Sequence, residues 1–160
     1  MPRWLDRWAP WIAGAVLVAG IVVFAVGRLT SGGSSAAARP VPLSPEARAV
    51  AREFVDTAVA RRRLGRSYDL VGPALKQGMS RTEWEGGTIP VVPYPVSESV
   101  ARFRVNGSYT DHALLEVDFY PRPKSTAKAE AFTLGLEKLA GRWLVAEWAP
   151  RTAVGARGGK

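Results

Sequence analysis

The longest apolar run of the chain lies near its N-terminus. Residues 9–27 contain no charged side chain, and at about 1.5 Å per residue a helix of this length nearly matches the ~30 Å hydrocarbon core of a bilayer. Trp8 and Trp11 lie at its start, where indole rings prefer the headgroup level, and Arg28 follows its end. The pattern predicts a short N-terminal tail, residues 1–8, and a transmembrane helix over residues 9–29 that has the lipid bilayer as its partner.

A cleaved signal peptide is the rival interpretation of this run. Arg3 and Arg7 would form its basic start, and the alanines at 36–38 would form its cleavage site. The run exceeds the ~7 to 15 apolar residues of such signals, and Arg28 lies between it and that site, which favours an uncleaved anchor. The basic residues on the two sides nearly balance, so charge gives no orientation. Because a short tail before a long C-terminal domain most often stays in the cytoplasm, we expect an extracytoplasmic domain on a single-pass protein of the cell membrane.

Residues 30–43 are rich in Gly, Ser, Ala and Pro and predict a linker between the anchor and a folded domain. Ser44 and Pro45 then form a helix start, with Ser44 as the N-cap. Apolar residues recur behind it at intervals of three and four, as on the buried face of a helix that ends at Gly65. Two short helical pieces are predicted at residues 68–71 and 73–76.

Ser80 and Glu83 have the spacing of a capping box and predict another short helix that ends at Gly86. Residues 89–95 contain three prolines, so we expect an extended segment there and no central strand. From Val96 onward the apolar period is two, which predicts four strands, over residues 97–109, 112–120, 130–139 and 142–149.

The turns predict how these strands pair. A three-residue connection, residues 109–111, sets Arg104 opposite Glu116 and Arg102 opposite Asp118 on a solvent-facing side of the sheet. A two-residue turn at Ala140 and Gly141 puts Glu147 on the apolar side, opposite Leu134.

These elements predict one α+β domain over residues 44–151. A long helix and short helices pack on a curved four-stranded antiparallel sheet, and residues 152–160 form a disordered basic tail.

The chain has no cysteine, which excludes disulfides and Cys-ligated zinc. Its net charge of +8 would attract anionic lipid, acidic protein or nucleic acid. Because the sequence contains no nucleic-acid-binding motif, we do not expect nucleic acid as a partner. The basic residues concentrate where the long helix is predicted to end, at Arg61, Arg62, Arg63 and Arg66. They are either ordinary C-terminal helix charge or a contact for a partner or an anionic surface.

Three segments carry a resemblance to a known family: residues 78–84 (GMSRTEW), 89–95 (IPVVPYP) and 141–150 (GRWLVAEWAP). Together with the element order, they resemble the NTF2-like (cystatin-like α+β) superfamily, and within it membrane-anchored members from actinobacteria. The resemblance implies a cone-shaped cavity between sheet and helices. It allows isomerase- or cyclase-type enzymes, which use an acid or an acid–histidine pair, and also non-catalytic domains of secretion and conjugation machinery.

Few residues have the chemistry of such a cavity. His112 falls at a turn and is expected to be exposed, while Glu116 and Asp118 are expected to be neutralised by arginine. Glu147 remains as a candidate ligand anchor, unless it is solvated or paired with Arg151. Aromatic residues that would line the cavity mouth with it are Tyr68, Trp84 and Tyr94. No catalytic set, metal-ligand set or cofactor site emerges.

We therefore expect a membrane-tethered, non-enzymatic module of the cell envelope whose partner is a membrane or envelope protein or a second copy of the chain. The alternative is a small-ligand binder or an enzyme of the isomerase or cyclase type that uses the cavity.

Overall fold

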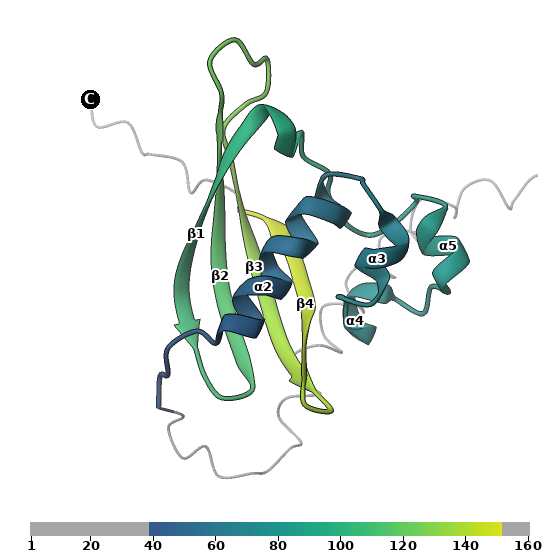
Figure 1. The fold of residues 1–160 in the computed structure, drawn as a ribbon, viewed down its shortest axis with the longest axis vertical. Helices are drawn as coiled ribbons and strands as arrows, with labels where there is room; N and C mark the ends of the chain where they lie inside the picture. The colour runs from purple at the N-terminus through teal and green to yellow at the C-terminus, as the bar shows by residue number, and fades with distance from the viewer. Residues whose placement is uncertain (1–38, 152–160) are drawn as a thin grey trace, which may run out of the picture. The chain divides into compact units, whose positions relative to one another are not determined.

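The computed structural model describes residues 39–151, and the predicted anchor, most of the linker and the C-terminal tail lie outside them. No helix within residues 39–151 is long and apolar enough to cross a membrane. All of the described helices precede the four strands in the chain (Figure 1). They are α2 (Pro45–Phe54), η2 (Val55–Val59), α3 (Leu64–Tyr68), α4 (Pro73–Lys76), α5 (Arg81–Glu85), η3 (Val96–Glu98), β1 (Ser99–Ser108), β2 (His112–Pro121), β3 (Glu130–Leu139) and β4 (Arg142–Pro150). The α+β class is therefore confirmed.

Helix α2 begins as predicted, because the Ser44 hydroxyl accepts a hydrogen bond from the Ala47 amide at 3.1 Å and Pro45 occupies the first turn. It does not run to Gly65. The helix widens into the π-helical segment η2, where the Thr57 hydroxyl donates to the Glu53 carbonyl at 2.6 Å, and the chain turns at Arg61 with a φ of 54°. Gly65 lies inside the next helix, α3.

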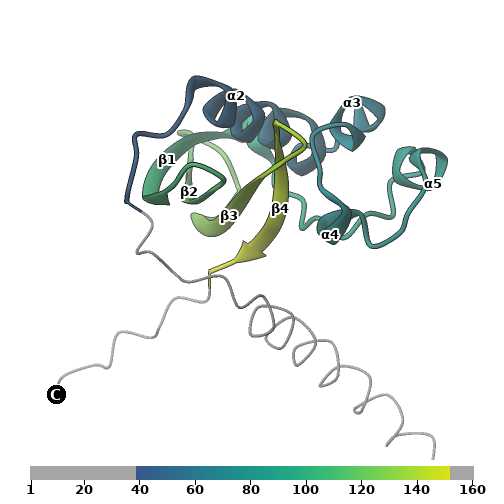
Figure 2. The same cartoon turned by 90° about the horizontal axis from the view of Figure 1, so that it is seen from below.

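The three short helices lie together beyond the β4 edge of the sheet, where α4 contacts β4 and α3 contacts η2 (Figure 2). Helix α4 has the predicted bounds, whereas α3 begins and ends earlier than the predicted piece at 68–71. The capping box at the start of α5 is confirmed in both directions, since the Ser80 hydroxyl accepts from the Glu83 amide and the Glu83 carboxylate accepts from the Ser80 amide. The bonds from Ser80 lower the pKa of Glu83 below its ordinary value.

The sheet has the order β1-β2-β3-β4, with every neighbouring pair antiparallel, and it curls around α2 (Figure 2). Arg104 lies opposite Glu116 and Arg102 opposite Asp118, as predicted. The hairpin reaches this register differently from the prediction. The Tyr109 amide donates to the His112 carbonyl, so the loop has two residues, and a bulge between Val105 and Gly107 restores the pairing.

A second bulge corrects the prediction for Glu147. The turn at Ala140 and Gly141 has the predicted place, with positive φ at both residues. Between Gly135 and Leu136 the pairing slips by one residue, so that Trp148, and not Glu147, lies near Leu134 on the core side. Glu147 lies opposite Gly135 and is exposed, because a slip of one residue reverses the face of every side chain beyond it.

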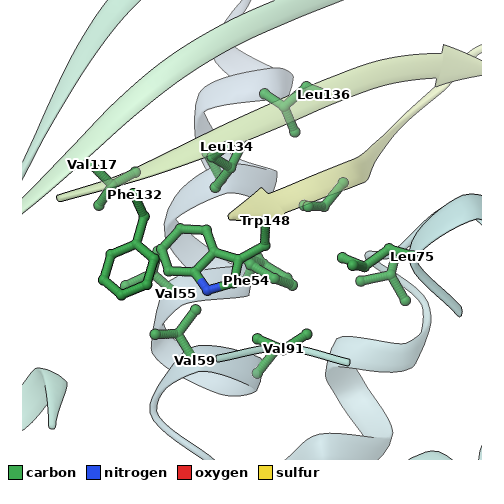
Figure 3. Packing of buried hydrophobic residues seen from close by; sticks show 14 of the residues in the cluster. Phe54, Val55, Val59, Leu75, Val91, Val117, Phe132, Leu134, Leu136 and Trp148 are labelled. Atoms are coloured by element: carbon green, nitrogen blue, oxygen red, sulfur yellow. The ribbon is translucent and has the colours of Figure 1, made fainter. Parts of the chain in front are cut away.

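The core lies between α2 and the concave face of the sheet (Figure 3). Its largest fully buried side chains are Trp84 of α5, Phe54 of α2, Phe119 of β2 and Phe132 of β3. The ring of Phe132 stacks on Trp148 of β4 at 4.5 Å, and Phe54 meets Trp148 edge-on at 5.6 Å. The helix and the sheet are thus joined through one aromatic cluster.

Candidate functional site

The aromatic residues predicted to line a cavity mouth serve packing. Trp84 is fully buried, and its indole N–H donates to the Ser67 hydroxyl at 2.8 Å. Tyr68 packs edge-on against Trp84, its hydroxyl donates to the Met79 carbonyl at 3.1 Å, and the Lys76 ammonium lies 4.0 Å from its ring centroid. These contacts join α3, α4 and α5.

Tyr94 belongs to the same hydrophobic core but packs against different aromatic rings. Its ring stacks on Phe119 at 4.2 Å, and its hydroxyl donates to the Lys128 carbonyl at 2.6 Å. Burial, followed by the negative charge of Glu130, raises the pKa of this hydroxyl. Tyr68 and Trp84 therefore lie together, Tyr94 lies apart from them, and Glu147 lies on the opposite face of the sheet. The structure does not assemble these four residues into one site.

Carboxylates on the convex face of the sheet form an ion network. Glu116 accepts from Arg104 at 2.6 Å and also pairs with Arg151, while Asp118 lies 3.0 Å from Arg104. The predicted pairing of Arg102 with Asp118 is not the observed ion pair, since Arg102 lies over the ring of Tyr120. The prediction that this ladder faces solvent is wrong for the acids, because Glu116 and Asp118 are only 7 % and 8 % exposed.

His112 lies on the surface at the start of β2, as expected. Its ring stacks on Tyr109 and its Nδ1 is 2.7 Å from the Asp111 carboxylate, and the hydrogen bond from His112 lowers the pKa of Asp111. Among residues 39–151, no group of three or more His, Cys, Asp or Glu side chains has the arrangement of a metal site.

The structure divides the four predicted contact arginines. Arg61 donates to the carbonyls of Gly87 and Val91 at 2.9 and 2.6 Å and so ties the end of η2 to the extended segment that follows α5. Arg66 pairs with Glu53 of α2. Both therefore stabilise the fold.

Arg62 and Arg63 are exposed and line a hollow of about 470 Å³ between the end of η2 and the start of β1. Arg122, which follows β2, contributes a third guanidinium; its Nε donates to the Ser99 carbonyl at 3.2 Å. The polar wall also includes Ser97, and Asp56 is the only carboxylate among the lining residues of this hollow. We call this feature the basic hollow.

A second hollow, of about 440 Å³, lies between the start of α2 and the β3–β4 turn. Its charged residues balance, with Glu46 and Asp69 against Lys138 and Arg142. The basic hollow, with three guanidinium groups against one carboxylate, has the clearer preference for an anion.

Sequence reasoning found Arg62 and Arg63 but missed Arg122, Ser97 and Asp56. Arg122 is distant from the other two arginines in sequence, and only the antiparallel return of β2 brings it to them. Asp56 is visible in the sequence only as a polar position on the long helix.

No protein-family model matches this chain, and comparison with curated proteins and with solved structures found no match.

Proposed function

We propose that this protein is a membrane-tethered, non-enzymatic interaction module of the cell envelope, and that it binds an acidic partner at the basic hollow. The observation that carries the proposal is the position of Arg62, Arg63 and Arg122 around one recess against the single carboxylate of Asp56. Guanidinium groups form strong charge-assisted hydrogen bonds with carboxylates, so such a recess favours an anionic group.

The packing of the core supports an interaction module over the alternative, a ligand-binding or isomerase-type cavity. The space between α2 and the sheet is occupied by the rings of Phe54 and Phe132, each of which packs against Trp148. Glu147, the acid that such a cavity would use, is exposed on the other face. The NTF2-like family, and a place in secretion or conjugation machinery, remain part of the proposal through the resemblance of the sequence.

The predicted tether supports a partner in the envelope. An anchor over residues 9–29 and a linker over residues 30–43 would keep the domain within a few tens of ångströms of the membrane, on its extracytoplasmic side. At that distance membrane and envelope proteins are the partners most often encountered.

Co-purification from membranes tests the proposal. The double variant Arg62→Glu, Arg63→Glu should lose the co-purifying protein, because each reversal replaces attraction by repulsion, and retention of the wild-type partner should fall as salt shortens the Debye length. Glu147→Gln is the matched control and should retain the partner. Loss of the partner in Glu147→Gln, with retention in the arginine double variant, would contradict the proposal and favour the ligand-binding alternative.

A further inference from the structure

The basic hollow lies along the free edge of a β-strand. Its lining includes Ser99, Val100 and Ala101, the first residues of β1, together with Ser97 just before them. Strand β1 is an edge strand because it is first in the sheet order. We infer that the hollow receives an extended, acidic segment of a partner protein, which pairs with β1 from Ala101 onward while its carboxylates meet the arginines. This inference rests on the proposed function and names the conformation and chemistry of the partner.

The two edges of the sheet differ within the described chain. The edge of β4 is covered, since the Val145 amide donates to the Leu70 carbonyl and the Gly72 amide donates to the Val145 carbonyl, each at 2.8 Å. On β1, the segment before α2 contributes a bond from the Val41 amide to the Ser108 carbonyl, at the end of the strand. At the start of the strand, the Ser99 amide donates to the Val96 carbonyl and the Ser99 carbonyl accepts from Arg122. Within residues 39–151, no comparable bond from outside the sheet covers Ala101, so the free edge begins there. An uncovered edge offers its N–H and C=O groups to an added strand.

The charges of the hollow select an acidic segment. Arg62 and Arg63 follow η2, which packs on the concave side, and Arg122 lies beyond the end of β2. Arg122 already uses its Nε on Ser99, which leaves its terminal nitrogens for a ligand. Within residues 39–151, none of these three arginines forms an ion pair. Carboxylates of a partner would supply the missing acceptors.

Alternation along a strand predicts the pattern of that segment. Successive side chains point to opposite faces, so every second one would point to the helix side, where Arg62 and Arg63 lie. The others would lie beside Val100, whose side chain is 48 % exposed on the convex face. Alternating acidic and apolar residues fit both faces.

The position of the hollow favours a protein segment over the headgroups of the protein's own membrane. The chain enters the domain at Val41, beside the end of β1, whereas the hollow lies at the start of β1 (Figure 1). The ten residues of β1 separate the two points, which at about 3.3 Å per residue is roughly 30 Å. A tether attached at one end of the strand leaves the other end available to a partner.

Peptide binding to the full chain, solubilised in a neutral detergent, tests the inference. The probe is a fluorescein-labelled peptide of alternating Val and Glu, and the measurement is fluorescence anisotropy. Binding should weaken at least about tenfold in the double variant Arg62→Glu, Arg63→Glu, and it should strengthen in Asp56→Asn, which removes the one repelling carboxylate. The matched control is Arg48→Glu, Arg52→Glu, the same charge change on exposed positions of α2, which should bind as wild type. Circular dichroism verifies that each variant is folded.

Two altered probes separate the parts of the inference. A peptide with Gln in place of Glu should bind at least about tenfold more weakly, and so should the Val–Glu peptide with alternate amides N-methylated on the pairing edge, which removes backbone donors. Undiminished binding of the N-methylated probe would overturn strand pairing. Failure of the Val–Glu probe to bind would overturn the proposal that the ligand is a protein segment. The same proposal would be overturned if only phosphatidylglycerol vesicles displaced the probe and N-methylation had no effect. If the co-purifying protein is still lost in the arginine double variant, the proposed function survives such a failure.

Discussion

Arginines on the convex face of the sheet and arginines around the basic hollow have different roles. Arg104 and Arg151 cover the buried carboxylates of Glu116 and Asp118 and complete an ion network. Arg62 and Arg63 lie on a recess whose only carboxylate is Asp56. The difference teaches that an arginine contributes to stability where the fold supplies its acceptor, and is available to a partner where the fold does not.

Removing an acid from the convex network should have the largest effect on stability. Glu116→Ala should lower the free energy of unfolding by about 1–3 kcal/mol, since Glu116 is buried and its loss leaves Arg151 without a carboxylate and Arg104 with Asp118 alone. An exposed pair would contribute only ~0.2–1 kcal/mol. The measurement is a denaturant melt, with Arg62→Glu, Arg63→Glu as the comparison that should stay within about 0.5 kcal/mol of wild type. A loss below 0.5 kcal/mol for Glu116→Ala would mean that the network is solvated and that the contrast is false.

Two adjacent arginines at the end of η2 give a smaller and closer comparison. Arg61→Met should lower the free energy of unfolding by about 1–2 kcal/mol, because it removes the bonds to the carbonyls of Gly87 and Val91 while keeping a stem of similar length. Arg62→Met should leave stability unchanged within about 0.5 kcal/mol. Denaturant melts of the two variants side by side measure the difference. Equal losses would show that Arg62 also has a structural role.

Local signals in the sequence predicted much of this fold. The Ser44 cap, the capping box at Ser80 and the Ala140–Gly141 turn each depend on residues within a few positions of one another, and all three are present. The pairing of Arg104 with Glu116 was also correct, although a bulge and a shorter loop together produce it.

What the sequence could not predict depends on distant contacts. The only local marker of the bulge at Gly135 is on β4, where the charged Glu147 and the apolar Trp148 break the period of two; the bulge reverses the face of Glu147 and brings Trp148 into the core. The burial of Glu116 arises because arginine side chains from β1 and from beyond β4 cover it. The basic hollow exists only because the chain returns along β2 and places Arg122 beside Ser99.

Site-specific labelling in native membranes tests most directly the claim that the basic hollow is where the partner binds. The chain has no cysteine, so Ser97→Cys in the hollow and Thr82→Cys on α5 each give one reactive thiol on an exposed position. In membranes that contain the partner, a maleimide should react several-fold more slowly with Cys at 97 than it does in the purified chain, whereas its rate at 82 should not change. Adding Arg62→Glu and Arg63→Glu should restore the rate at 97. Equal rates at 97 in membranes and in the purified chain would contradict the account.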